Sequence, residues 1–290
     1  MNTKNIRYLL RFIPDKIYLQ ICYYLKLKKR LNLENPQHFN EKIQWLKLYS
    51  RNPEYTMMVD KYRVREYVKK VCSNEVKLIP LIGGPWKNVE DINIDELPNQ
   101  FVLKCNHDSG SIVICKDKTT FDWQAAKQKL DYCVKHNFWY LGREWAYKNV
   151  KPCIIAEKYM VDESKAELKD YKVFNFNGKP QFIQLDIDRF ISHKRNLYDT
   201  DWRLLRNTLE YPSGKNIYVE RPALLDKMLE QAAKLSEKIP FLRTDFYIIN
   251  DELYFGELTF YPGSGLEKFE PDDLGQKAGN WIRLPEKGEK

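Results

Sequence analysis

The spacing of apolar residues along the chain changes from a helical to a strand-like period, and this change predicts an α+β protein. Between residues 122 and 138 apolar side chains recur every three or four positions, on one face of a helix: Trp123, Ala126, Leu130, Cys133 and Val134. Similar patterns predict helices over residues 38–48, 60–71 and 222–239, the last with a proline near its first turn.

Short runs rich in β-branched and aromatic residues come in pairs that are joined by turn sequences. The Asn-Gly turn of the second pair is the strongest short-range signal for a hairpin. The three pairs are 100–104 with 111–116 across a polar loop, 171–176 with 180–186 across Asn177-Gly178, and 244–249 with 253–259 across Asn250-Asp251. A further strand is expected over residues 153–160. We therefore expect antiparallel sheets whose strands carry the polar residues of interest.

The N-terminal 30 residues carry almost all of the net charge. The 290-residue chain has 48 Lys+Arg and 40 Asp+Glu, a net charge of +8. Residues 1–30 hold eight basic residues and one acid, Asp15, so +7 lies there and +1 in the rest. A nucleic-acid-binding protein would spread its basic charge over a binding face. We expect an amphipathic helical segment with a break near Pro14, which either lies on an anionic membrane surface or packs on the body as a helix pair.

The composition narrows the class of protein and its compartment. With 43% hydrophobic and 30% charged residues, the chain is neither disordered nor collagen-like. Its longest uncharged apolar run, residues 17–25, is far shorter than the ~20 residues that span a bilayer. The six cysteines contain no C-x-x-C pair, which argues against a zinc site or a disulfide framework. We expect a cytoplasmic protein with reduced thiols.

Common nucleotide and nucleophile motifs are absent, so the candidate chemistry rests on polar residues of the strands. The sequence contains no G-x-x-x-x-G-K-[ST], G-x-G-x-x-G or G-x-S-x-G. Lys104 ends a predicted strand before the polar loop at 105–110. Such a loop can surround polyphosphate with its N–H groups while the lysine supplies charge, although an edge lysine also protects a hairpin from aggregation.

The last hairpin carries two carboxylates, Asp245 and Glu257, twelve residues apart on facing strands. If paired positions sum to 502, the two lie opposite each other with Cβ atoms ~5 Å apart, which favours a shared cation such as Mg²⁺. A two-residue turn would pair positions summing to 501 and separate their faces. We therefore expect a three-residue loop or a bulge between them.

These segments, taken in order, resemble the ATP-grasp superfamily and within it the TupA-like group. That group is found in teichuronopeptide, capsule and lipopolysaccharide gene clusters, and its members are often described loosely as glycosyltransferases. The resemblance runs from about Asn35 to Gly265 and rests on six segments: Phe39–Trp45, Asp60–Tyr62, Phe101–Lys104, Ile155–Tyr159, Asp170–Phe174 and Gly256–Pro262.

The resemblance implies a role for each matching residue. Lys61 and Lys104 match the two lysines near the ATP phosphates, and Asp108, Ser109, Gly110 and Ser111 match the flexible loop that closes over the triphosphate. Glu157, Lys158, Tyr159 and Met160 match the hinge whose backbone reads adenine, and Asp170 and Lys172 the polar pair after it, with Lys172 a catalytic candidate. Arg243 matches the arginine that stabilises developing negative charge, and Asp245 and Glu257 match the magnesium ligands. Lys194 and Arg195 are further phosphate contacts, and Thr259 stands where the family has a third metal ligand, asparagine.

The resemblance further implies two α+β subdomains that clasp ATP, at residues 59–156 and 157–290, after a helical segment at 1–58. It implies a carboxylate–amine ligase that uses ATP and Mg²⁺ to join a uronic acid to an amino acid through an acyl-phosphate. A typical member has an α/β domain ahead of the fold, whereas only about sixty residues precede Lys61 here.

Two other functions fit parts of the sequence. Asp186-Ile187-Asp188 has the D-x-D form that holds manganese in many nucleotide-sugar glycosyltransferases, although a plain polar strand end looks the same. A non-catalytic binder of anionic glycans could use Trp86, Trp139, Trp145 and Trp202 with their basic neighbours.

Overall fold

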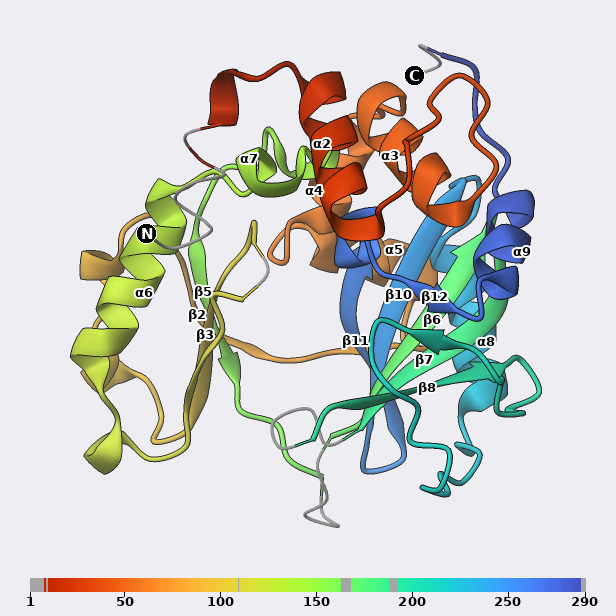
Figure 1. Cartoon of the computed structure of the whole chain (residues 1–290). Helices are drawn as coiled ribbons and strands as arrows, with labels where there is room; N and C mark the ends of the chain where they lie inside the picture. Colours follow the sequence, from red (N-terminus) through yellow and green to blue (C-terminus); the bar gives the residue numbers. More distant parts are fainter. Residues whose placement is uncertain (1–7, 9, 109, 163–167, 188–191, 288–290) are drawn as a thin grey trace.

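The computed structural model describes residues 8, 10–108, 110–162, 168–187 and 192–287. Within them, two β-sheets lie side by side, with α2, α3, α4 and α7 gathered at one end (Figure 1). The helices are Asp15–Leu27 (α2), Phe39–Tyr49 (α3), Glu54–Val59 (α4), Val64–Cys72 (α5), Trp123–Lys135 (α6), Trp139–Gly142 (α7), Leu225–Leu235 (α8) and Asp273–Trp281 (α9).

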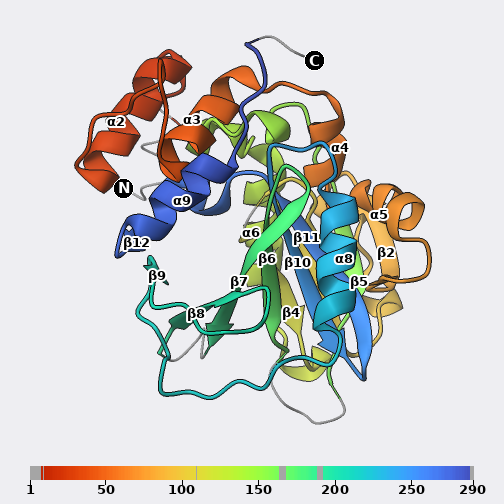
Figure 2. The same cartoon turned by 90° about the vertical axis from the view of Figure 1, so that its right-hand side faces the viewer.

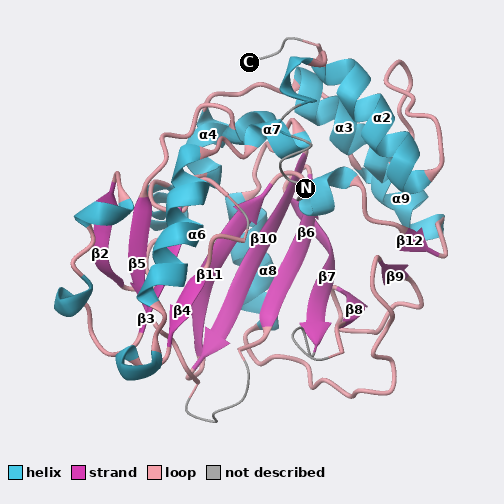
Figure 3. Cartoon of the chain, turned by 60° about the vertical axis from the view of Figure 1, so that its left-hand side comes forward, coloured by secondary structure: helices cyan, strands magenta, loops and turns pink. Residues whose placement is uncertain are grey.

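The smaller sheet has four antiparallel strands in the order β2-β5-β3-β4, and α6 covers one of its faces (Figure 3). Its strands are Leu81–Trp86 (β2), Phe101–Cys105 (β3), Val113–Cys115 (β4) and Ile154–Lys158 (β5). Phe101, Leu103 and Cys105 alternate inward along β3 and pack with Leu130 of α6, while Lys104 points to the other face. The predicted hairpin of β3 and β4 is confirmed.

The larger sheet has six strands in the order β1-β11-β10-β6-β7-β8. All neighbours run antiparallel except β1 and β11. The strands are Lys77–Leu78 (β1), Asp170–Phe176 (β6), Lys179–Ile187 (β7), Lys194–Asp199 (β8), Phe241–Ile249 (β10) and Glu252–Thr259 (β11). Helix α8 packs across this sheet, with α5 against it (Figure 2). A separate pair of two-residue strands joins Thr208–Leu209 (β9) to Phe269–Glu270 (β12).

Both predicted hairpins of the larger sheet, around Asn177-Gly178 and Asn250-Asp251, are confirmed, and each has a two-residue turn. Asn177 and Gly178 have φ values of 49° and 77°, and Asn250 and Asp251 have 49° and 57°. Positive φ at both turn positions matches the twist of the flanking strands, which is why asparagine, aspartate and glycine occupy such turns. The α+β prediction with antiparallel sheets is therefore confirmed.

Three parts of the prediction need correction. The helix expected from residue 60 begins only at Val64, because the Asp60 carboxylate accepts the N–H groups of Tyr62 and Arg63 at 2.9 and 3.2 Å and holds a turn there. The helix expected over 222–239 is shorter, at Leu225–Leu235. Eight elements were not predicted from the sequence: α4, α7, α9, β1, β2, β8, β9 and β12.

At the N-terminus, Pro14 precedes α2, which packs Tyr18, Leu19 and Tyr23 against the body. Packing on the body is therefore the correct interpretation for this face of α2; residues 1–7 and 9 of the predicted segment lie outside the described residues. Within the described part of the chain, no helix is both long and apolar enough to cross a membrane.

The predicted domain boundaries stay a prediction. Strand β1 falls inside the predicted small subdomain at 59–156 but pairs with β11 of the larger sheet. Strand β5 runs across the predicted boundary between residues 156 and 157.

Candidate active site

The two carboxylates of the last hairpin lie opposite each other because of a bulge. From Phe246↔Phe255 to Ile249↔Glu252 the strands follow the register of the two-residue turn, and the register then shifts so that Asp245 faces Glu257. Gly256 is the extra residue, and a Cβ there would lie 2.9 Å from the Asp245 carbonyl oxygen. A side chain would block this close approach, so glycine makes the bulge possible. The predicted bulge is confirmed.

Arg243 binds both carboxylates. Its Nε and Nη2 lie 2.7 and 2.6 Å from the two oxygens of Asp245, and Nη2 lies 2.9 Å from Glu257 Oε1. Nη2 also donates to Thr259 Oγ1 at 3.1 Å, and that hydroxyl donates to Glu257 at the same distance. Asp245 is buried, whereas the Glu257 side chain is 43% exposed. These four candidate residues therefore form one cluster, bidentate at Asp245.

A second group of charges lies next to this cluster on β6, β7 and β8. Lys172 faces Asp245 in the register of β6 and β10. Its Nζ lies 2.5 Å from Asp170 and 2.8 Å from Asp186 on β7. Asp186 also accepts from Arg195 Nε at 2.7 Å. The predicted pair Asp170 and Lys172 is thus an ion pair within a longer network; Lys194 begins β8, opposite Ile187.

The charges of this network shift the pKa values of its carboxyl groups in opposite directions. Burial raises the pKa of Asp245 and outweighs the lowering effect of Arg243, while the negative charges of Asp170 and Glu257 raise the pKa further. Burial would also raise the pKa of Asp186, but Lys172 and Arg195 outweigh it and hold the pKa well below its usual range. Of these two carboxylates, Asp245 is therefore the one whose ionised form a further nearby cation would stabilise more.

The donor set of this cluster fits Mg²⁺. The carboxylates of Asp245 and Glu257 share one guanidinium, that of Arg243, so this group of three side chains has one net negative charge. Mg²⁺ needs only one or two protein carboxylates when phosphates supply further oxygens. Among the described residues no group of three or more His, Cys, Asp or Glu could by itself hold a metal ion. Any such ion would have to share its ligands with Arg243.

The candidates on the smaller sheet form a separate ion pair. Lys104 Nζ on β3 lies 2.6 Å from Glu157 on β5, and both side chains are largely buried. Arg65 of α5 approaches the same carboxylate at 3.8 Å. The Lys158 side chain is exposed while its N–H donates to Pro80 O at 2.9 Å, and Tyr159 and Met160 follow directly after β5.

The loop after Lys104 is fixed at both ends. Ser111 Oγ donates to Asp108 at 2.5 Å and accepts the Cys105 N–H at 2.9 Å. Gly110 has a φ of +105° and open space around it, a conformation that side chains rarely adopt. Ser109 lies outside the described residues.

Lys61 connects the loop to the carboxylates. Its Nζ donates to the Asp108 carbonyl, and its N–H donates to Asn106 O at 3.0 Å. Desolvation would raise the pKa of Glu257, but the positive charges of Arg243 and Lys61 hold it below its usual range. Lys61 therefore acts on residues of both sheets.

The D-x-D sequence and the four tryptophans, on which the glycosyltransferase and glycan-binding interpretations depend, have different surroundings in the structure. Asp186 of the D-x-D sequence is neutralised by Lys172 and Arg195 inside the protein, and Asp188 lies outside the described residues. The four tryptophans lie on separate segments, and Trp202 is buried against Tyr198 with its Nε1 donating to Val219 O.

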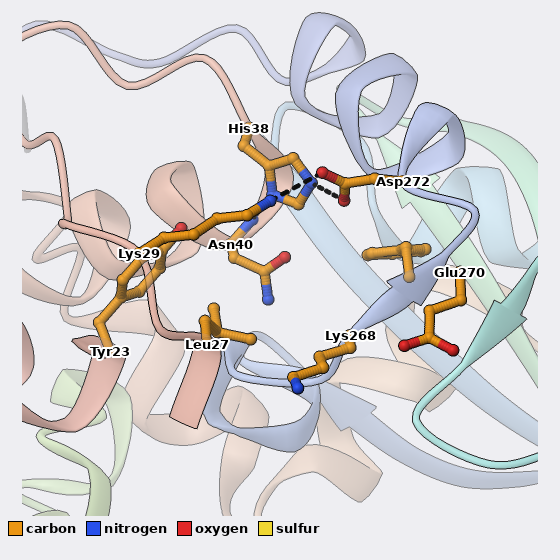
Figure 4. Close-up of a pocket in the computed structure, with 9 residues that line it drawn as sticks. Tyr23, Leu27, Lys29, His38, Asn40, Lys268, Glu270 and Asp272 are labelled. Carbon is orange, nitrogen blue, oxygen red and sulfur yellow. Dashed lines mark hydrogen bonds and ion pairs between the residues drawn. The ribbon is translucent and has the colours of Figure 1, made fainter. Parts of the chain in front are cut away.

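A pocket of about 250 Å³ lies apart from these candidates, between the end of α2, β12 and α9 (Figure 4). In it His38 Nε2 and Lys29 Nζ lie 2.8 and 2.9 Å from the two oxygens of Asp272. None of the predicted site residues lines it.

Two features of the site were not predicted from the sequence: Arg65, and the role of Asp186 as the centre of an ion-pair network. Arg65 lies on α5, and the spacing of apolar residues along that helix does not predict a contact with Glu157 of β5. Asp186 and Arg195 face each other in the register of β7 and β8. Because β8 was not predicted, the one available signal was their opposite charge on either side of a short polar segment.

Comparison with known proteins identifies the family. The family model of TupA-like ATP-grasp proteins matches residues 41–283. Solved structures with similarity include D-alanine–D-alanine ligase from Bacillus anthracis with ATP, at 18% identity and a TM-score of 0.39, over 70% of this chain and 55% of that one. N5-carboxyaminoimidazole synthetase from Staphylococcus aureus with ADP has 17% sequence identity and a TM-score of 0.40, and the match covers 79% of this chain and 52% of that one. D-alanine–D-alanine ligase from Helicobacter pylori has 15% sequence identity and a TM-score of 0.45, and the match covers 86% of this chain and 68% of that one. The chain thus spans about half the length of the first two, and no curated protein matches it. The match of the family model over residues 41–283 shows that the chain belongs to the TupA-like ATP-grasp family.

Proposed function

We propose that this protein is an ATP-dependent carboxylate–amine ligase. The γ-phosphoryl group of ATP passes to a substrate carboxylate, so that the bond to ADP breaks and an acyl-phosphate forms. An amine then attacks the acyl carbon, loses a proton and expels phosphate, which leaves an amide. The observation that carries the proposal is the cluster of Arg243, Asp245, Glu257 and Thr259 on facing strands, with Lys172 beside it.

Phosphoryl transfer needs positioned charge rather than a protein nucleophile, and this cluster supplies it. Lys61 and Lys104 would contact the phosphates, and the N–H groups of residues 108–111 would close over them. Arg243 and Lys172 would stabilise the charge that develops on the transferring group and on the tetrahedral intermediate. Mg²⁺, held by Asp245 and Glu257 with Thr259 beside them, would neutralise the phosphate oxygens.

The adenine would lie against the backbone of residues 157–160, with Asp170 at the ribose. A carbonyl and an N–H of an extended segment can read a base edge, so the exposed side chain of Lys158 agrees with this role. The buried ion pair of Glu157 with Lys104 would fix that segment against β3.

For the substrates we propose a uronic acid in a saccharide and an amino acid, in polysaccharide assembly on the cytoplasmic side. The support is the family resemblance, since such polymers offer a sugar carboxylate and an amino acid offers the amine. Glycosyl transfer with a nucleotide sugar is the alternative.

The test has two stages. Titration calorimetry with ATP and Mg²⁺ should show binding that weakens in Lys104→Ala and Glu257→Gln. Glu252→Gln is the matched control, because Glu252 is an exposed carboxylate at the far end of the same strand. Uronic acids are then screened with ATP and hydroxylamine, which converts an acyl-phosphate to a stable hydroxamate.

Hydroxamate formation with the wild type, and not with Glu257→Gln, supports the ligase. Absence of ATP binding, together with binding of UDP-sugars and Mn²⁺ that Asp188→Ala abolishes, would replace it by a glycosyltransferase. Asp188 is the better probe, because removing Asp186 would also remove the buried anion that Lys172 and Arg195 share.

A further inference from the structure

Helix α2 has two apolar faces, and the structure buries only one. Tyr18, Leu19 and Tyr23 pack against the body. On the other side Ile17, Ile21, Tyr24 and Leu25 are 49%, 44%, 55% and 62% exposed. At about 100° per residue these four side chains fall within an arc of about 100°, which borders the arc of the buried face on one side.

An apolar outer face is unusual for a surface helix, which normally presents polar residues to water. Phe12, just before the helix, is 82% exposed, with the Arg11 guanidinium 4.8 Å from the centre of its ring. The apolar surface therefore extends beyond the N-terminus of α2. We call Phe12, Ile17, Ile21, Tyr24 and Leu25 the outer face.

The basic residues of α2 and of the three residues after it divide into two sets. Lys26 pairs with Glu210, and Lys29 with Asp272 at the edge of the pocket in Figure 4, so these two fasten α2 to the body. Lys16, Lys28 and Arg30 are exposed, and within the described part of the chain they make no ion pair. Lys28 extends the line of the outer face at its C-terminal end.

We propose that the outer face of α2 docks on an anionic lipid surface, with the helix parallel to the membrane plane. Its apolar side chains would enter the acyl boundary while Lys16, Lys28 and Arg30 meet anionic headgroups. Tyr24 suits this position because its ring is apolar and its hydroxyl polar.

The charge of the segment favours a membrane over a second copy of the chain. A two-fold interface through this face would bring together two copies of Lys16, Lys28 and Arg30, and like charges at an interface oppose association. An anionic bilayer complements the same charge. The inference does not depend on the ligase activity, because no candidate site residue lies on α2.

Co-sedimentation of the full-length protein with vesicles tests the inference. Vesicles of phosphatidylcholine alone are compared with vesicles that also contain phosphatidylglycerol. We expect binding to the anionic vesicles, weakened by salt, and a fall of at least about tenfold in Ile17→Ser/Ile21→Ser/Leu25→Ser. Lys16→Gln/Lys28→Gln/Arg30→Gln should lose the preference for anionic lipid. Deleting residues 1–30 is a poorer test, because it also removes the buried Tyr18, Leu19 and Tyr23.

The matched control is Leu204→Ser/Tyr218→Ser, which removes exposed apolar side chains at 41% and 88% exposure from another part of the surface. It should bind vesicles as the wild type does. Thermal unfolding and ATP titration of every variant show whether the fold and the nucleotide site are intact, so failure of the ligase proposal is recognised separately. Equal vesicle binding by the Ile/Ile/Leu variant and the wild type, or no binding by either, overturns the inference. If sedimentation velocity instead shows a dimer that this variant dissociates, a second copy covers the face.

Discussion

Replacing Gly256 by alanine should damage the candidate metal site through the backbone alone. The new Cβ would lie 2.9 Å from the carbonyl oxygen and 3.2 Å from the carbonyl carbon of Asp245. Backbone atoms cannot rotate away as a side chain can, so the strands must separate or the bulge must move. Either change shifts Asp245 relative to Glu257, whose alignment depends on this bulge.

The expected stability cost is that of forcing extra volume into a packed site, about 2 kcal/mol, which lowers the Tm of a 290-residue chain by about 3 °C. Binding of Mg²⁺ and ATP should weaken by about tenfold or more, because misplaced ligands lose most of a charge-assisted contact. Thermal unfolding and calorimetry measure the two effects on the same samples.

Gly178→Ala is the matched control. Gly178 lies in the turn between β6 and β7 with a φ of +77°, and the nearest atom to a Cβ there is 3.4 Å away. Alanine should cost about 1 kcal/mol through its backbone conformation and leave nucleotide binding unchanged. If Gly256→Ala bound Mg²⁺ and ATP as the wild type does, the bulge would not position the metal ligands and the reasoning would be refuted.

Further predictions concern the two ion-pair groups. Lys104→Ala should weaken ATP binding by about 10–100-fold in calorimetry, and unchanged affinity would remove Lys104 from the phosphate site. Asp186→Asn should lower the free energy of unfolding by about 2–3 kcal/mol in urea titrations, because Lys172 and Arg195 would lose the buried anion that they share and keep only Asp170 and Glu267 as partners. The lowered pKa of Asp186 means that its stabilisation is complete above its unfolded pKa of about 3.9 and is lost as the pH falls further. Asp186→Asn should therefore flatten the loss of stability below about pH 4, and an unchanged acid limb would contradict this assignment.

The elements that could be predicted from the sequence are those fixed by local chemistry. Asn177-Gly178 and Asn250-Asp251 define their hairpins without help from the rest of the chain, since both turn residues adopt positive φ. The opposition of Asp245 and Glu257 followed from strand periodicity once like charges were required to share a cation. The roles of the site residues came from the family resemblance and stay proposals.

The elements that were missed depend on distant partners. Strand β1 is two residues long and exists only because β11 pairs with it in parallel. Helix α9 contains Gly275 and Gly279, which on propensity alone argue against a helix. A Cβ at Gly279 would lie 2.0 Å from Gln37 O, so the glycine is needed for close packing of α9 on the start of α3. In α9 the stabilisation from tertiary packing therefore outweighs the low helix propensity of its glycines.

Lys61 shows why a site formed between two sheets is hard to derive from periodicity. It lies in the turn before α5, so no helix face or strand alternation marks it. Asn106, which accepts its N–H, is itself held by an N–H donated to Cys153 O and by a side-chain oxygen that accepts the Cys153 N–H at 2.8 Å. The ammonium group is thus held beside the loop of the smaller sheet while its charge acts on Glu257 of the larger one. A change in the position of this loop would move Lys61 and alter the charge near Glu257, so the position of the loop and the candidate metal site are linked through one residue.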